Sequence, residues 1–155
     1  MPFIVPALSD VGLAHHYSLE PHEYNNCPPE DLYQATLAEL AFARFLGPDA
    51  HAYCCARLAR SKPTDDDYRF DILHNGVKID VKTAMRRTNS KNLVLNQRHD
   101  EVRYVLLDEP NEWEHGFLFA GWSSGRHILP ARQGAAYNFF KHRNELGTLS
   151  TFLSI

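Results

Sequence analysis

The strongest local constraint in the sequence is the dipeptide Asn75-Gly76, which lies between two short runs of alternating apolar and polar residues. An Asn-Gly pair in this setting is the strongest short-range signal for a β-hairpin with a two-residue turn. Such a turn fixes which residues face each other across the two strands. We therefore expect residues 69–74 to pair with residues 77–82 in antiparallel register, with Asp71 opposite Asp80.

The period-two alternation of a strand divides the side chains of this hairpin between an apolar face and a polar face. The polar face places two aspartates at opposite positions, where the β-carbons lie about 5 Å apart and like charges destabilise the pair. A cation between them would remove the repulsion, either a divalent metal ion or the side chains of Lys82 and Arg69. The expected apolar face comprises Phe70, Ile72, Val77, Ile79 and Val81, and the polar face comprises Arg69, Asp71, Lys78, Asp80 and Lys82.

The composition is that of a single soluble globular domain, with 155 residues of which 44% are hydrophobic and 23% charged. There is no apolar run of about 18 residues and no signal-like start, so neither a membrane span nor secretion is indicated. Cys27, Cys54 and Cys55 lack zinc spacing and cannot all pair, which favours reduced cysteines and a cytoplasmic protein. The net charge of −3 argues against bulk electrostatic binding of nucleic acid, but six basic and two acidic residues lie between positions 82 and 103.

One helix is strongly indicated, over residues 30–46, with an acidic first turn and Gly47-Pro48 as its end. Glu39 falls in the middle of the apolar stripe of this helix, where a carboxylate is costly unless it meets an arginine or a metal ion. Residues 1–29 are expected to form an extended arm or a short strand before a single domain of residues 30–155. The remaining expected elements are strands at 51–59, 103–108, 116–121 and 126–129 and a helix at 131–144, which indicates an α/β fold with a mixed sheet.

The segments Phe70-Asp71 and Ile79-Asp80-Val81-Lys82, preceded by a helix that carries Glu39, resemble the PD-(D/E)XK nuclease superfamily. The resemblance covers residues 30–108, and Phe70 stands where the family usually has a proline. It implies a restriction-endonuclease-like fold, which is a mixed sheet with flanking helices and an α-β-β-β-α-β type core.

Carboxylates that hold Mg²⁺ can neutralise a phosphodiester, generate a nucleophile from water and stabilise the leaving oxygen. We expect Asp71 and Asp80 to be ligands of Mg²⁺, for which Mn²⁺ can substitute, and the resemblance adds the main-chain carbonyl of Val81. Glu39 is expected to hold a second ion directly or through water. Lys82 is expected to orient or activate the attacking water and to stabilise the charge of the phosphorane.

The expected function is Mg²⁺-dependent hydrolysis of DNA by a small stand-alone endonuclease of the phage or resolvase type, with homodimerisation possible and no membrane or nucleotide cofactor involved. Arg86, Arg87 and Lys91 follow the expected site closely and are candidates for phosphate contacts. Two alternatives stay open. One is a catalytically silent module on the same fold that binds nucleic acid or protein, and the other is an exonuclease or an RNase.

Several further polar residues are interpreted as structural. Asn96 and Gln97 are capable of contacting phosphates or base edges, but a lone Asn-Gln pair is more typical of an ordinary loop. His74 and His99 have no evident partner that would make either of them a general base.

Overall fold

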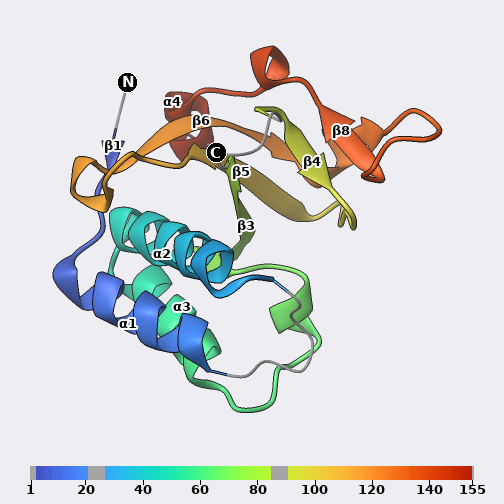
Figure 1. The fold of residues 1–155 in the computed structure, drawn as a ribbon. Coiled ribbons are helices and arrows are strands. Elements are labelled where there is room, and N and C mark those ends of the chain that lie inside the picture. The colour runs from blue at the N-terminus through green and yellow to red at the C-terminus, as the bar shows by residue number, and fades with distance from the viewer. Residues whose placement is uncertain (1–2, 21–26, 85–90, 155) are drawn as a thin grey trace.

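A computed structural model describes residues 3–20, 27–84 and 91–154 of the chain. Its main sheet has five strands in the order β1-β6-β5-β3-β2, and a second, three-stranded sheet has the order β4-β8-β7. Figure 1 shows the three long helices gathered on one side of the main sheet, with the small sheet at the far end of the molecule. None of the described helices combines the length and apolar character needed to cross a membrane. The α/β class, with a mixed sheet and flanking helices, is confirmed.

The helices and strands have the following bounds. The helices are α1 (Leu8–Leu19), α2 (Pro29–Leu46), α3 (Pro48–Ala59) and α4 (Leu149–Leu153). The strands of the main sheet are β1 (Phe3–Ile4), β2 (Ile72–His74), β3 (Val77–Ala84), β5 (Val102–Asp108) and β6 (Phe117–Ser124). Those of the small sheet are β4 (Leu93–Leu95), β7 (Leu129–Pro130) and β8 (Phe139–Lys141).

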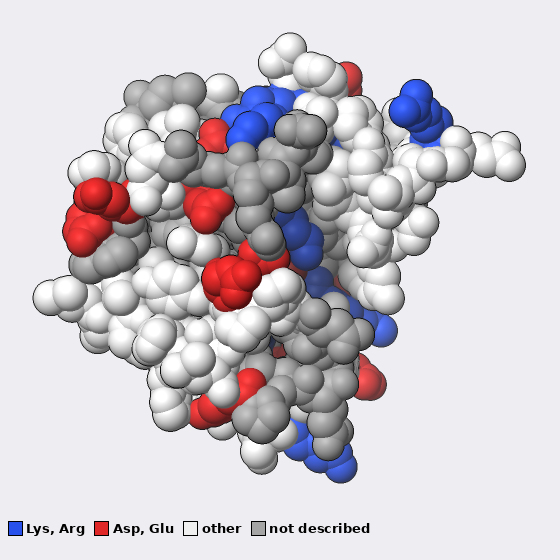
Figure 2. Space-filling model, in the orientation of Figure 1, with Lys and Arg blue, Asp and Glu red and all other residues white. Residues whose placement is uncertain are grey.

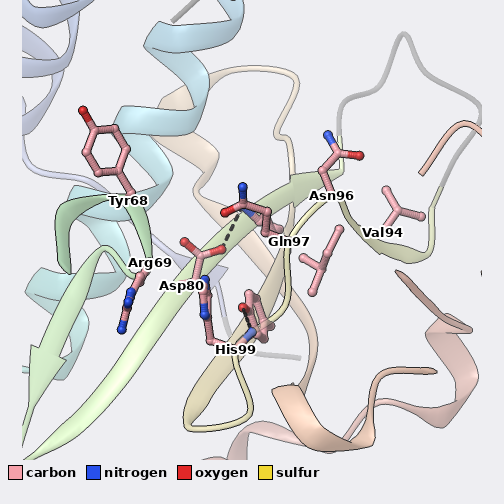
Figure 3. Close-up of a pocket in the computed structure, with 10 residues that line it drawn as sticks. Tyr68, Arg69, Asp80, Val94, Asn96, Gln97 and His99 are labelled. Carbon is pink, nitrogen blue, oxygen red and sulfur yellow. Dashed lines mark hydrogen bonds and ion pairs between the residues drawn. The ribbon is translucent and has the colours of Figure 1, made fainter. Parts of the chain in front are cut away.

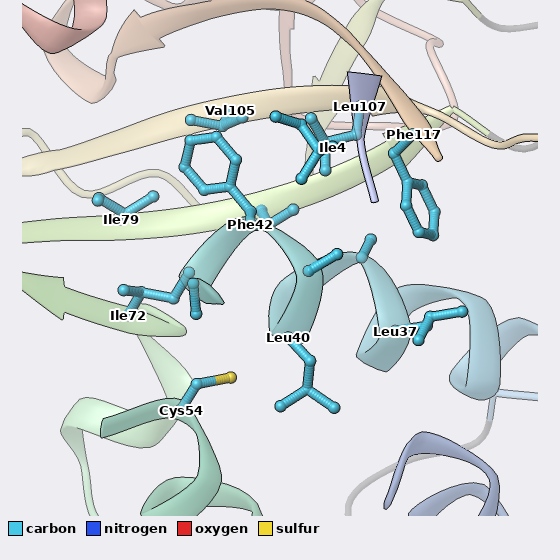
Figure 4. Close-up of a cluster of buried hydrophobic side chains, with 14 of the residues drawn as sticks. Ile4, Leu37, Leu40, Phe42, Cys54, Ile72, Ile79, Val105, Leu107 and Phe117 are labelled. Carbon is cyan, nitrogen blue, oxygen red and sulfur yellow. The ribbon is translucent and has the colours of Figure 1, made fainter. Parts of the chain in front are cut away.

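The main hydrophobic core lies between α2 and the sheet. Helix α2 begins with Pro29, Glu30 and Asp31, because proline and acidic residues are favourable in the first turn of a helix. It ends at Leu46, with Gly47 as its C-cap, as predicted. Phe42 is fully buried against the face of the sheet that carries alternate residues of β3 and β5 (Figure 4). Labelled members of this core are Ile4, Leu37, Leu40, Phe42, Cys54, Ile72, Ile79, Val105, Leu107 and Phe117.

A second, smaller core covers the opposite face of the main sheet. It combines Tyr104 and Leu106 of β5 with Leu93 and Leu95 of β4, so the small sheet packs over this face. Because β3 and β5 pair in parallel register, with Asp80 opposite Tyr104 and Lys82 opposite Leu106, the polar residues of β3 share this second face.

The Asn75-Gly76 turn forms as predicted, and both residues have positive φ, at 50° and 77°. The pairs His74–Val77, Leu73–Lys78 and Ile72–Ile79 have the predicted register. Beyond Ile72 the prediction is wrong, because the ladder does not continue to Phe70 and Arg69. Phe70 leaves the predicted apolar face and packs in the second core, where its ring stacks on Tyr53 with centroids 6.0 Å apart.

Three predicted elements differ from the structure. Residues 126–129 do not form one strand, because Gly125–His127 is a 3-10 helix and only Leu129 belongs to β7. Residues 51–59 belong to helix α3, in which Ala50, Cys54 and Leu58 are buried at a spacing of four residues. The spacing is helical, and Pro48 occupies the first turn, where proline is tolerated. Residues 131–144 contain strand β8 instead of a helix, and β8 pairs with Leu93–Leu95.

The N-terminal segment contains the predicted short strand, β1, and a helix that the sequence did not indicate, α1. Asp10 of α1 is buried and accepts hydrogen bonds from Arg44 of α2 at 2.7 and 3.0 Å. His51 of α3 lies 2.7 Å from the same carboxylate. Although burial alone would raise the pKa of Asp10, the hydrogen bonds from Arg44 and His51 hold it below its ordinary value. One carboxylate therefore joins three helices.

Candidate active site

The regular pairing of the hairpin ends at Asp71. The side-chain carboxylate of Asp71 takes the place of a main-chain carbonyl as a hydrogen-bond acceptor for β3. Its backbone N–H donates to the carbonyl of Ile79 at 2.9 Å, and its Oδ2 accepts from the N–H of Val81 at 2.9 Å. In a continued ladder the Val81 N–H would donate to the carbonyl of Phe70. Because β2 stops at Ile72, β3 is the edge of the sheet at Asp80 and Lys82. Side chains from the helices can therefore approach β3 at this edge.

Two helical side chains do so. Arg57 of α3 donates from Nε to the main-chain carbonyl of Asp71 at 3.2 Å, and its Nη2 lies 3.9 Å from Oδ1 of the same residue. The same guanidinium forms an ion pair with Glu39 of α2. The side chains of Glu39 and Arg57 are 14% and 11% exposed, so the pair is largely removed from water. Of the two partners considered for Glu39, an arginine or a metal ion, the structure shows the arginine.

Lys82 supplies the second cation. Its Nζ lies 2.8 Å from Oδ2 of Asp80, whose side chain is 11% exposed. Oδ2 is shielded from solvent, so this ion pair lies in a largely dry environment. We refer to Glu39, Asp71, Asp80, Arg57 and Lys82 together as the carboxylate cluster.

Carboxylates outnumber cations in the carboxylate cluster, and their pKa values reflect this. Burial and the negative charge of Asp71 raise the pKa of Glu39 to about 8, against the opposing effect of Arg57. Burial and the charge of Asp71 likewise raise the pKa of Asp80 to about 7. The charge of Asp80 raises the pKa of Lys82 above its ordinary value, so Lys82 is an ammonium ion at neutral pH. Protons on Glu39 and Asp80 thus neutralise part of the negative charge of the carboxylate cluster, and a bound cation would neutralise the same charge.

The carboxylate cluster opens into a pocket of about 290 Å³, which we call the Lys82 pocket (Figure 3). Asp80 and Lys82 form its floor on β3, Tyr68 and Arg69 come from the segment before β2, and residues 94–97 and His99 come from β4 and the loop after it. On the helical side, Glu39, Arg57 and Tyr68 line a smaller pocket of about 110 Å³. The carboxylate cluster therefore lies between two pockets that share Tyr68.

The donor set of the carboxylate cluster is compatible with Mg²⁺. Among the residues that the structure describes, no three His, Cys, Asp or Glu side chains are arranged as a closed metal-ligand group. Mg²⁺ does not require one, because it retains several waters and is commonly bound through one or two carboxylates. Asp71 and Asp80 are adjacent carboxylates, and the charge of each raises the cost of leaving the other without a cation.

The structure thus brings together Glu39, Asp71, Asp80, Val81 and Lys82 of the expected site. Lys91 is exposed at the start of the small sheet, where its carbonyl accepts a hydrogen bond of 2.7 Å from Arg143, and it does not line the Lys82 pocket. Arg86 and Arg87 lie outside the described residues. Figure 2 shows basic side chains along the boundary between the helical layer and the part of the molecule that carries the small sheet.

Sequence reasoning missed Arg57 because it assigned residues 51–59 to a strand. A helical assignment would have placed Arg57 three residues after Cys54, near the buried face of α3. No family model, curated protein or solved structure matches this chain.

Proposed function

We propose that the protein is a metal-dependent nuclease that hydrolyses phosphodiester bonds of DNA, with a restriction-endonuclease-like core of the PD-(D/E)XK superfamily. The observation that supports this most is the grouping of the buried Asp71 and Asp80 with Lys82 at the unpaired edge of β3, next to a pocket. A fold that needed only stability would gain little from this grouping, because buried like charges are costly.

Each residue has a chemical role in this proposal. Asp71 and Asp80, with the main-chain carbonyl of Val81, would hold Mg²⁺, and Glu39 would hold a second ion directly or through water. A divalent ion bound there supplies neutralisation of the phosphate charge and lowers the pKa of a bound water. Arg57 fixes the positions of Glu39 and Asp71 through its contacts with both.

The role of Lys82 follows from its charge. An ammonium ion cannot accept a proton, so Lys82 orients the attacking water by donating hydrogen bonds and stabilises the negative charge that develops on the phosphoryl oxygens. Its Nζ is held beside Asp80, and its side chain is 44% exposed toward the Lys82 pocket. A phosphate in the pocket would therefore meet a preoriented cation.

The test is incubation with supercoiled plasmid, linear duplex, single-stranded DNA, branched DNA and RNA, each with Mg²⁺, Mn²⁺ or EDTA. We expect cleavage of DNA with either ion, none with EDTA, and a loss of at least 100-fold in Asp80→Asn and Lys82→Ala. Glu112→Gln, at an exposed carboxylate remote from the Lys82 pocket, should cleave like the wild type. Binding without cleavage of any substrate would contradict the proposal, as would cleavage that survives Asp80→Asn.

A further inference from the structure

The Lys82 pocket is built from more than the carboxylate cluster. Its far wall is the loop after β4, which carries the amides of Asn96 and Gln97 and the imidazole of His99. Figure 3 shows Gln97 close to Asp80, with Asn96 and His99 further along the pocket that they line. The sequence alone favoured an ordinary loop for the two amides and a structural role for His99. Because these residues line the same pocket as Asp80, they are candidates for contacts with a ligand.

One buried polar atom of the residues that line the pocket has no hydrogen-bond partner among the described residues. This atom is Nε2 of His99, which makes no hydrogen bond to any described residue. Oδ2 of Asp80, by contrast, is paired with Nζ of Lys82 at 2.8 Å. Buried polar atoms are nearly always paired, so an unpaired atom at the wall of a pocket indicates a missing polar partner. The pocket thus offers a ligand two polar groups, the unpaired Nε2 of His99 and the ammonium group of Lys82.

The size of the pocket limits what that ligand is. A volume of about 290 Å³ is at the lower end of small-molecule sites, so it accommodates one nucleotide and is far too small for a duplex. Amide side chains form paired hydrogen bonds with base edges. Tyr68 at the rim is 56% exposed and presents an aromatic ring on which a base can stack. The phosphate of the same nucleotide would reach Lys82.

We propose that the Lys82 pocket takes the base of one unpaired nucleotide next to the phosphate that is cut, so that the preferred substrate is single-stranded DNA. This inference rests on the proposed nuclease function. A base held between Gln97, His99 and Tyr68 cannot at the same time be stacked and paired within a duplex, and removing it from a duplex requires unstacking and unpairing it. A single strand does not incur the cost of breaking a base pair.

The test compares the affinity of the protein for three DNA probes in Ca²⁺, an oxygen-seeking ion of the same charge as Mg²⁺. The probes are a 12-nucleotide single strand, the duplex of the same sequence, and a single strand of 12 abasic nucleotides. Fluorescence anisotropy of a terminal dye gives each dissociation constant. We expect the wild type to bind the single strand about 10-fold more tightly than either of the other two probes, since stacking of one base contributes about 1–3 kcal/mol.

The double variant Gln97→Ala, His99→Ala should lose this preference while its affinity for the abasic strand stays unchanged. Asn111→Ala, at an exposed position outside the pocket, should behave like the wild type. Circular dichroism checks that each variant is folded. The inference is overturned if the double variant keeps the preference, or if the wild type binds duplex as tightly as single strand.

Failure of the inference and failure of the proposed function give different results. Cleavage of DNA by a wild type that shows no preference for bases would overturn the base pocket and leave hydrolysis intact. A preference for bases that depends on Gln97 and His99, without cleavage in Mg²⁺ or Mn²⁺, would support the base pocket and contradict the nuclease proposal.

Discussion

At the scale of single residues, Arg57 determines how three carboxylates are tolerated at one edge of the sheet. It contacts Glu39 and Asp71 while Lys82 contacts Asp80, so each cation serves a different part of the carboxylate cluster. Removing one partner of a buried ion pair is much more costly than the pair is worth, because the remaining charge stays buried. The stability of the metal-free protein should therefore depend strongly on Arg57.

We predict that Arg57→Ala lowers the free energy of unfolding by about 2–4 kcal/mol in EDTA. Urea denaturation followed by circular dichroism measures this difference. Millimolar Mg²⁺ should restore stability more in Arg57→Ala than in the wild type, because the ion takes over part of the charge compensation. Arg132→Ala, at an exposed position, is the matched control and should change stability by less than about 0.5 kcal/mol. An equally small effect of Arg57→Ala would contradict its placement between two carboxylates.

The raised pKa values of Glu39 and Asp80 predict a pH dependence of stability. Both groups bind protons more tightly in the folded than in the unfolded chain, so their effect is fully favourable below their ordinary pKa values of 4.5 and 3.8. This stabilisation is lost as the pH rises through the pKa values in the folded protein, which are about 8 for Glu39 and about 7 for Asp80. The melting temperature in EDTA should fall between pH 5 and pH 8. Glu39→Gln should make this decrease smaller, and an unchanged decrease in that variant would contradict the raised pKa.

At the scale of elements, the hairpin turn sets the register that brings Asp71 to β3. Gly76 has a φ of 77°, a conformation that costs a residue with a side chain about 1–2 kcal/mol. Gly76→Ala should therefore lower the free energy of unfolding by about this amount in urea denaturation. Gly12→Ala provides a control of opposite sign, because Gly12 is exposed within helix α1 and a β-carbon there meets no atom within 4 Å. It should stabilise the protein by about 0.5–1 kcal/mol, and a stabilising Gly76→Ala would contradict the turn geometry.

Elements with a local signal were predictable from the sequence. The turn at Asn75-Gly76, helix α2 with its acidic start and Gly47 end, and strand β5 all formed as expected. Helix α3 was assigned to a strand from a weak apolar–polar alternation. The four-residue spacing of its buried residues Ala50, Cys54 and Leu58, which is typical of a helix, was not considered. Strand β8 was misassigned because its identity depends on pairing with β4, more than 40 residues earlier in the chain. Tertiary pairing of this kind has no local signature.

The proximity of several candidate site residues was predictable from the sequence because they lie close together in the chain. Asp71, Asp80, Val81 and Lys82 lie within 12 residues of one another on the two sides of one turn. The pairing set by the turn ends at Ile72, and Asp71 contacts β3 through hydrogen bonds with Ile79 and Val81. Glu39 was found because a carboxylate interrupted an apolar stripe. Arg57 and the wall of the Lys82 pocket were not found, because helix packing and the docking of the small sheet bring them to the site from distant segments.

At the scale of the whole molecule, the two hydrophobic cores cover opposite faces of the main sheet. The helices bury one face, and Glu39 and Arg57 reach the site from that side. The small sheet covers the other face and completes the Lys82 pocket over Asp80 and Lys82. The carboxylate cluster is therefore buried enough to shift pKa values, and it is still open to a ligand on one side.

The central claim is that Asp71 and Asp80 hold a divalent ion, and isothermal titration of Mn²⁺ into the protein tests it most directly. We predict binding by the wild type with release of protons at pH 7.5, because the ion displaces protons from the carboxylate cluster. Asp80→Asn should lose most of the binding, whereas Asp100→Asn, whose side chain is 64% exposed, should bind like the wild type. Equal binding by wild type and Asp80→Asn, or no binding by the wild type, would contradict the claim.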